Sequence, residues 1–128
     1  MASVYLALQE SLGRHVALKM LKKFDRPEDS ERFLNEGRTI AALNHPNIIT
    51  IHDIGFDGER PFIAMEYLEG GSLTQRIERG TTPEAAVDIV IAIGACLDFV
   101  HRRGMIHRDV KPANILFHLN GTPKLTDF

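Results

Sequence analysis

The segment at residues 82–104 constrains the fold more than any other because it is apolar on almost every side. It opens with Thr-Pro-Glu at 82–84, which supplies a capping side chain, a proline at the first helical position and an acidic first turn. The 16 residues from 85 to 100 carry two charges, and Gly104 ends the helix. This run is too short and too charged to span a membrane, so it must be buried inside a larger body.

The other periodic segments predict a small antiparallel sheet with one helix. Alternating apolar residues predict strands, and a proline followed by acidic residues predicts the start of a helix. The expected strands are 4–8, 15–20, 48–54 and 61–65, and the expected helices are 27–43 and 73–79. Strand pairs that precede a helical region indicate an α+β fold.

A second hairpin is predicted at the C-terminal end of the chain. Asn120-Gly121 lies between apolar runs, which is a strong signal for a two-residue turn with both residues at positive φ. That turn pairs residues whose numbers sum to 241, and it places Asn114 opposite Asp127 with Cα atoms roughly 4.5–5.5 Å apart. An amide oxygen and a carboxylate that converge in this way suit Mg²⁺. Pro123 requires its missing N–H to lie outside the ladder.

The eight residues at 107–114 read H-R-D-V-K-P-A-N and resemble the catalytic loop of the protein kinases, with Val110 where leucine is usual. The resemblance implies that Asp109 is the catalytic base, that Asn114 binds Mg²⁺ and that Lys111 steadies the transferring phosphate. A lysine at this position is typical of the serine/threonine branch. A plain polar loop that ends in proline explains the match less well.

Lys19 lies in the strand predicted at 15–20, and Ala17 lies on the same face two residues earlier. The V-A-L-K sequence at 16–19 resembles the V-A-I-K strand of kinases, in which the lysine holds the α- and β-phosphates. The resemblance implies that Lys19 binds ATP and that Ala17 and Val4 cover the adenine. Considered alone, Lys19 would be a solvated surface residue.

Glu36 lies in the helix predicted at 27–43, on the apolar stripe that includes Phe33 and Ile40. A carboxylate on a buried face requires a cationic partner. The kinase resemblance implies that this partner is Lys19. An exposed glutamate at the edge of the stripe remains the alternative.

The segment at 66–71 resembles the kinase hinge, where the main chain offers adenine a donor and an acceptor. Met65 would then guard the back of the nucleotide pocket. The residues assigned to nucleotide binding by resemblance in this part of the fold are Met65, Glu66, Leu68 and Leu116.

Both ends of the chain fall inside kinase motifs. Val4 matches the last position of G-x-G-x-x-G-x-V, and Asp127-Phe128 match the first two letters of D-F-G, so Asp127 is a second expected Mg²⁺ ligand. We therefore expect a truncated catalytic domain in which the helix at 83–103 loses much of its cover. Its parts would be an incomplete N-lobe at 1–66, a hinge at 67–71 and the start of a helical C-lobe at 72–128.

The resemblance implies a eukaryotic-like serine/threonine kinase of bacterial type, which uses ATP and Mg²⁺ to phosphorylate serine or threonine of a protein substrate. A non-catalytic ATP-binding or interaction fragment is the alternative. A small-molecule kinase of related fold is less favoured because it gives no reason for K-P-A-N or for L-N-H-P-N at 43–47.

Composition adds few constraints. The chain has 128 residues, enough for one modest core, and a net charge of −2, which does not favour nucleic-acid binding. Cys96 is the single cysteine, so an internal disulfide is excluded and a reducing, cytoplasmic setting is expected. The six histidines show no metal-ligand spacing, and His45 is interpreted as structural. The sequence identifies neither the protein substrate nor the oligomeric state.

Overall fold

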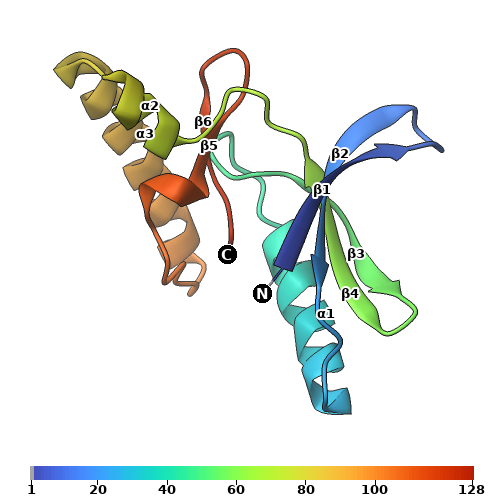
Figure 1. Cartoon of the computed structure of the whole chain (residues 1–128). Coiled ribbons are helices and arrows are strands. Elements are labelled where there is room, and N and C mark those ends of the chain that lie inside the picture. The colour runs from blue at the N-terminus through green and yellow to red at the C-terminus, as the bar shows by residue number, and fades with distance from the viewer. Residues whose placement is uncertain (1) are drawn as a thin grey trace. The chain divides into compact units, whose positions relative to one another are not determined.

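The computed structural model describes residues 2–128, and Figure 1 shows their course. The chain divides into two compact units. One unit runs up to Leu43 and continues from Thr50 to Tyr67, and the other comprises Asn44–Ile49 and Leu68–Phe128. The elements in order are β1 (Ala2–Gln9), β2 (Arg14–Leu21), α1 (Pro27–Ala41), β3 (Ile51–Asp57), β4 (Arg60–Glu66), α2 (Leu73–Arg79), α3 (Pro83–Arg102), the 3₁₀ turn η1 (Pro112–Asn114), β5 (Ile115–Phe117) and β6 (Pro123–Leu125).

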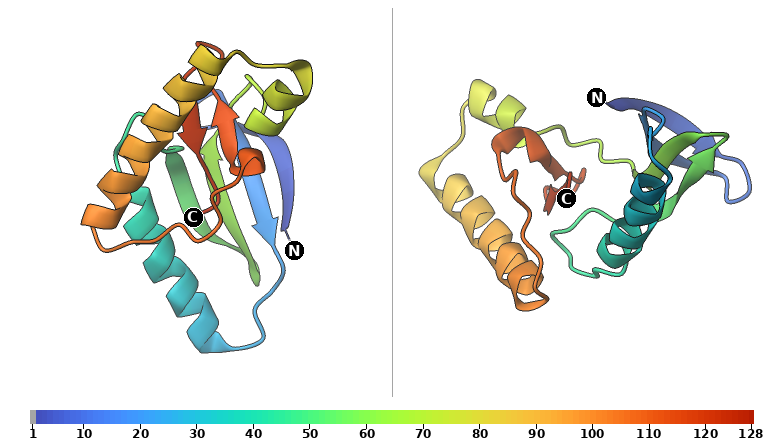
Figure 2. Two further views of the ribbon diagram at one scale, coloured as in Figure 1. Left: turned by 90° about the vertical axis from the view of Figure 1, so that its left-hand side faces the viewer. Right: turned by 90° about the horizontal axis from the view of Figure 1, so that it is seen from below.

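The first unit is a four-stranded antiparallel sheet in the order β1-β2-β4-β3, with α1 beside it (Figures 1 and 2). The predicted strands pair in an antiparallel sheet, although β3 begins at Ile51 rather than at residue 48. The turn between β1 and β2 uses Gly13 at φ 63°, and the turn between β3 and β4 uses Gly58 at φ 62°. Both are conformations that glycine adopts without steric cost.

Helix α1 begins at Pro27 as predicted, with Glu28 and Asp29 in its first turn, and it ends at Ala41 rather than at residue 43. Gly37 is its only buried residue. A Cβ at this position would overlap the Cδ1 of Ile54 on β3, so the glycine allows the helix to lie close to the sheet. The close approach explains a residue that lowers the helix propensity by about 1 kcal/mol relative to alanine.

In the second unit, two helices begin with side-chain caps and a short hairpin lies at the centre. Ser72 and Gln75 form a capping box at the start of α2, and Thr82 accepts a hydrogen bond from the N–H of Ala85 at the start of α3. Phe117 on β5 and Leu125 on β6 are fully buried. The cap predicted at Thr82 is therefore confirmed, and Ser72 caps the other helix.

Other segments extend the β5–β6 hairpin on both sides. The N–H of Gly70 donates to the carbonyl of Phe117 at 2.8 Å, and the N–H of Phe117 donates to the carbonyl of Gly71 at 2.9 Å. On the other side, the N–H of Leu125 donates to the carbonyl of Asn47 at 2.8 Å, and the N–H of Ile49 donates to the carbonyl of Leu125 at 3.1 Å. The hairpin is therefore the middle of a small four-segment sheet.

The turn of this hairpin differs from the prediction by one residue. Ile115 pairs with Leu125 and Phe117 with Pro123, so the paired numbers sum to 240. Gly121 has a positive φ of 92°, whereas Asn120 does not, and the loop has three residues. Asn114 consequently lies opposite Thr126, and the expected pairing of Asn114 with Asp127 is wrong.

Side-chain hydrogen bonds explain the longer loop. The Asn120 side chain accepts from the N–H of Thr122 at 2.9 Å, and Nδ1 of His118 accepts from the N–H of Asn120 at 3.1 Å. These local bonds stabilise a turn other than the two-residue type. The prediction for Pro123 is confirmed. Pro123 pairs with Phe117, but the N–H of Phe117 donates to the carbonyl of Gly71 on the other side of β5. The two paired residues therefore exchange no main-chain hydrogen bond, and the ladder does not require an N–H from Pro123.

Helix α3 is buried along one stripe and exposed along another. Ile89, Ile93, Cys96 and Val100 are buried, whereas Val87, Val90 and Ile91 are 56%, 70% and 64% exposed. One side of this apolar helix is therefore exposed, although the sequence predicted burial nearly all round. Within the described residues, no helix is both long enough and apolar enough to cross a bilayer.

The Cys96 thiol is expected to be unreactive in the folded chain. It is completely buried, and burial raises its pKa to about 11, so very little thiolate is present at pH 8. Iodoacetamide should therefore alkylate the native chain at least about 100-fold more slowly than the urea-unfolded chain. An intact-mass time course measures both rates, and equal rates would show that α3 does not bury this side chain.

Candidate active site

In the first unit, the sheet register brings four of the predicted nucleotide residues onto one face. Val4 lies directly opposite Lys19, and Ala17 lies directly opposite Met65. Residues that face each other in an antiparallel ladder point to the same side, and Ala17 and Lys19 share a side because they are two apart. Ile63 pairs with Lys19 and also with Ile54, the residue that contacts Gly37 of α1. Helix α1 thus covers the β3 side of this face.

Glu36 departs from the expectation. Its side chain is exposed, so the prediction that it lies on the buried stripe of the helix is wrong. Gly37 occupies the buried position instead, and one residue of helix turns Glu36 by about 100° away from it. In the part of the chain that the structure describes, Glu36 makes no ion pair. Its pairing with Lys19 remains a prediction.

The segment predicted as the hinge is held at both of its ends. The N–H of Glu66 donates to the carbonyl of Thr50 at 2.9 Å, and Oε1 of Glu66 accepts from the N–H of Thr50 at 2.9 Å. In the second unit, Leu116 forms a bridge with Ser72, and Leu68 precedes the glycines bonded to Phe117. Leu68 and Leu116, both half-buried, therefore lie in the same unit.

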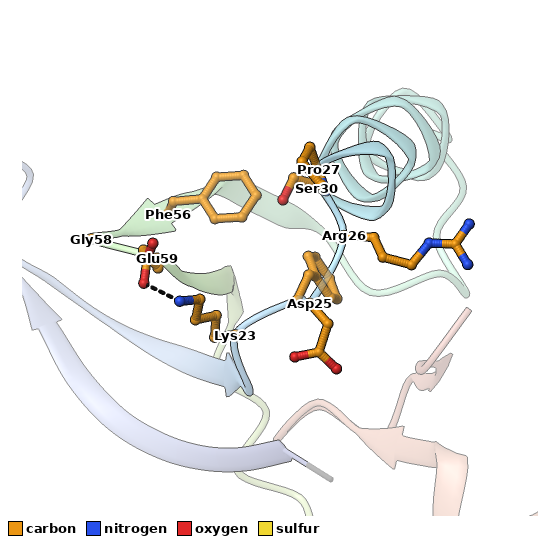
Figure 3. A pocket seen from close by; sticks show the side chains of 9 residues that line it. Lys23, Asp25, Arg26, Pro27, Ser30, Phe56, Gly58 and Glu59 are labelled. Atoms are coloured by element: carbon orange, nitrogen blue, oxygen red, sulfur yellow. Dashed lines mark ion pairs between the residues drawn. The ribbon is translucent and has the colours of Figure 1, made fainter.

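The first unit contains a hollow of about 470 Å³, which Figure 3 shows from close by. The segment before α1 and the β3–β4 turn line it, including Phe24, Pro27 and Phe56. Lys23 and Glu59 form an ion pair of 2.7 Å at its edge, and this contact raises the pKa of Lys23. None of the residues assigned to ATP lines this hollow.

In the second unit, three residues of the H-R-D-V-K-P-A-N loop and Thr126, which follows β6, form a closed ring of hydrogen bonds. The N–H of Asp109 donates to Nδ1 of His107 at 3.1 Å, and Nε2 of His107 lies 2.6 Å from the carbonyl of Thr126. The N–H of Thr126 donates to the carbonyl of Asn114 at 2.9 Å. Nδ2 of Asn114 then donates to the carbonyl of Asp109 at 2.8 Å.

This ring fixes the tautomer of His107. Because Nδ1 accepts from the main chain, the ring proton is on Nε2, and Nε2 donates to Thr126. His107 is 5% exposed, and its ring packs against Phe128 with centroids 4.7 Å apart. The motif predicted no role for His107 or Thr126. The position of the histidine two residues before Asp109 was the only signal available.

The three residues predicted as catalytic are brought together. Nζ of Lys111 lies 3.3 Å from Oδ2 of Asp109, and Nδ2 of Asn114 lies 3.1 Å from the same oxygen. The Asp109 side chain is 57% exposed, whereas Asn114 is 5% exposed. The loop thus presents a carboxylate to solvent beside a cation, on a buried and hydrogen-bonded support.

Two non-glycine residues near this site have left-handed backbone conformations. Arg108 has φ 73° and Asp127 has φ 59°. Such residues cost of the order of 1–3 kcal/mol and persist where the surroundings impose them, which is frequent at functional sites. Here each one neighbours a member of the hydrogen-bonded ring.

Asn114 and Asp127 provide donors that suit Mg²⁺. Both Nδ2 contacts of Asn114 go to Asp109, which leaves its amide oxygen as the atom available to a cation. The Asp127 carboxylate is exposed and follows Thr126, the partner of Asn114 across the hairpin. Amide and carboxylate oxygens are the hard ligands that Mg²⁺ prefers. Among residues 2–128, no group of three or more His, Cys, Asp or Glu side chains forms another candidate metal site.

His45 has a structural role, as predicted. Its ring packs against Phe99 of α3 with centroids 4.9 Å apart, and its Nδ1 accepts from the N–H of Asn47 at 3.0 Å. Nδ2 of Asn47 donates to the carbonyl of Pro123 at 2.9 Å. The segment at 44–49 thus joins the hairpin to α3 within the second unit.

The chain matches a known protein family and several known proteins. The family described as the protein kinase domain matches residues 1–128. The chain is 40% identical over 133 residues to the serine/threonine-protein kinase PrkC of Bacillus subtilis, covering all of this chain and 20% of that protein. It is 39% identical over 137 residues to PknA and 42% identical over 134 residues to PknL, both of Mycobacterium tuberculosis.

These matches cover 100% of this chain for PknA and 99% for PknL, but 32% and 33% of the two relatives. The chain therefore spans about a fifth to a third of the length of the curated relatives it matches. The sheet with one helix, followed by the helices and the short hairpin, is the α+β arrangement expected for this family. The chain belongs to the protein kinase domain family and is similar throughout to bacterial serine/threonine-protein kinases.

Proposed function

We propose that this chain carries the nucleotide-binding and catalytic-loop residues of a serine/threonine protein kinase, which transfers the γ-phosphate of ATP to a protein hydroxyl. The observation that carries the proposal is the hydrogen-bonded ring that holds Asp109 beside Lys111 and Asn114. Phosphoryl transfer depends mainly on positioning and electrostatics, so a preorganised loop of this kind is what the chemistry requires.

In this proposal, Asp109 orients the substrate hydroxyl and accepts its proton. Lys111, held 3.3 Å from that carboxylate, stabilises negative charge on the phosphate during transfer. Asn114 and Asp127 would hold Mg²⁺, which would neutralise negative charge on the phosphates. The support from His107 and Thr126 keeps the loop in one conformation without contact with the substrate.

The nucleotide contacts are proposed from the resemblance to the kinase family. Lys19 would bind the α- and β-phosphates, and Glu36 would position Lys19. Val4, Ala17, Met65 and Leu116 would provide apolar contacts to adenine, and the main chain of Glu66 and Leu68 would provide its hydrogen bonds. The shared sheet face of Val4, Ala17, Lys19 and Met65 supports this part of the proposal.

A transfer assay with γ-labelled ATP, Mg²⁺ and a serine- and threonine-rich acceptor protein tests the proposal, with fluorescent ATP binding measured in parallel. Label recovered as phosphoserine or phosphothreonine is the expected result. Mg²⁺-dependent ATP binding without transfer would favour the non-catalytic ATP-binding alternative. Transfer only to tyrosine or to a small molecule would contradict the assignment.

A further inference from the structure

A hollow of about 390 Å³ in the second unit lies outside the residues proposed for catalysis and contains two arginines. We call it the arginine hollow, and it is lined by Gly70, Arg76, Arg79, Gly80 and Thr81. Arg76 and Arg79 are three residues apart on α2, so both side chains lie on the same side of the helix. Gly80 has φ 90°, and the chain turns there so that Thr81 also lines the hollow.

The two guanidinium groups can donate hydrogen bonds to an anion. Neither Arg76 nor Arg79 forms an ion pair within residues 2–128. The Arg76 guanidinium stacks over the Phe117 ring, with its carbon 3.6 Å from the ring centroid, and Nε of Arg79 donates to the carbonyl of Gln75 at 3.4 Å. A stacked guanidinium keeps its edge N–H groups available for two parallel hydrogen bonds to a phosphate.

Two acidic residues line a neighbouring hollow rather than the arginine hollow. Glu69 and Glu78 line a second hollow that shares Gly70 and Arg79 with the first. Neither carboxylate pairs with Arg76 or Arg79 in the described part of the chain. The arginine hollow itself is lined by two cations and no anion.

Thr81 places a hydroxyl at this site. Its neighbour Thr82 already uses its Oγ1 to cap α3, accepting from the N–H of Ala85 at 3.1 Å, whereas Thr81 is exposed and lies one residue before the cap. A negative group at this position would also lie near the positive end of the 20-residue helix α3. The chain thus combines a modifiable hydroxyl with three sources of positive potential.

We propose that Thr81 is a phosphorylation site and that its phosphate is bound by Arg76 and Arg79. In the reaction, Oγ1 of Thr81 attacks the γ-phosphorus of ATP held by a serine/threonine kinase, and a new O–P bond forms. The bond from that phosphorus to the β–γ bridging oxygen breaks, ADP leaves, and the hydroxyl proton passes to the carboxylate base of the kinase. A second kinase molecule can supply this step, so the site does not depend on the activity of this chain.

The bound phosphate would fasten the loop at 80–82 to α2. Because α2 follows the Gly70-Gly71 segment that is hydrogen-bonded to Phe117, the phosphate would stabilise the whole second unit. Phosphorylation that creates charge-assisted bonds to arginines commonly orders a loop in this way.

A semisynthetic chain with phosphothreonine at position 81 tests the recognition step. In ³¹P NMR titrations, the second pKa of this phosphate should be lower by about half a unit or more than in the R76Q/R79Q variant. The melting temperature should rise by about 3 °C or more on phosphorylation, and only when both arginines are present. The R32Q/R38Q variant, which removes two arginines of α1, should retain both effects. Equal phosphate pKa values and melting temperatures with and without Arg76 and Arg79 would overturn the proposal.

The modification step is tested with the unmodified chain, ATP, Mg²⁺ and an active bacterial serine/threonine kinase, followed by peptide mapping. Phosphate on Thr81 is expected, and phosphate found only at other positions would overturn the assignment.

A titration with inorganic phosphate distinguishes binding of a free anion from binding of a phosphate attached to Thr81. If millimolar inorganic phosphate gives wild type and Thr81→Val the full stabilisation, the hollow is a site for free anions and not for a modified threonine.

Discussion

Replacing Asp109 with asparagine is expected to lower the rate of phosphoryl transfer by about 10²- to 10⁴-fold, the usual contribution of a general base. Asparagine has nearly the same shape and can still accept from Nδ2 of Asn114, which lies 3.1 Å from Oδ2 of Asp109 in the native chain. It has no carboxylate to accept the substrate proton or to pair with Lys111. The measurement is the initial rate of label transfer from γ-labelled ATP at saturating nucleotide.

The matched control is Asp98→Asn. Asp98 is an exposed carboxylate of α3 whose Oδ2 forms a 2.9 Å ion pair with Arg102, a surface interaction that contributes little. This variant should transfer phosphate at the wild-type rate. ATP affinity and melting temperature should be unchanged in both variants. Undiminished transfer by Asp109→Asn would contradict the proposed role of Asp109.

Local signals were sufficient to predict the helix starts and the strand pairs. Pro27, Ser72 and Thr82 are each followed by the helix that their chemistry predicts, because capping depends on neighbours within three or four residues. The turn glycines Gly13 and Gly58 likewise act through their own φ angles. The sheet face that carries Lys19 then follows from the two-residue period of a strand.

The register of the last hairpin could not be predicted in the same way, because it depends on distant segments. Phe117 is hydrogen-bonded to the 70–71 segment and Leu125 to Asn47 and Ile49, and these contacts act together with the Asn120 and His118 side chains to select a three-residue loop. A shift of one residue exchanges the two faces of a strand. The one-residue shift therefore places Thr126, rather than Asp127, opposite Asn114.

Glu36 shows a second limit of periodicity. The positions of Phe33 and Ile40 indicate the general direction of the buried side of α1, but a glycine can lie closer to a strand than any other residue. Because α1 meets Ile54 at Gly37, the buried line passes through position 37 and leaves Glu36 outside. Whether position 36 or position 37 is buried therefore depends on the contact with Ile54 of β3.

The hydrogen-bonded ring shows what motif recognition leaves unexplained. The motif assigns roles to Asp109 and Asn114, but it does not say what holds them. His107 reaches the carbonyl of Thr126, 19 residues along the chain, so its role depends on how the loop and hairpin meet. The site is therefore predictable as a set of residues, whereas its support requires the fold.

Replacing Phe117 with alanine is expected to destabilise the chain by about 3–5 kcal/mol, the typical cost of removing a buried aromatic side chain. Phe117 is fully buried, and the Arg76 guanidinium stacks on its ring. Domains of this size are typically stable by only about 5–15 kcal/mol, so the loss would be a large fraction of the total. Urea unfolding followed by circular dichroism gives the change in midpoint and in the free energy of unfolding.

Leu119→Ala is the control, because Leu119 is 71% exposed two residues further along the same hairpin and should change stability by less than about 0.5 kcal/mol. Phe117→Leu retains an apolar side chain and should recover part of the loss, which keeps the comparison measurable if the alanine variant does not fold. Since β5 begins directly after Asn114, destabilising Phe117 should also weaken the support of the catalytic loop. Equal effects of Phe117→Ala and Leu119→Ala would show that β5 is not the buried centre of the second unit.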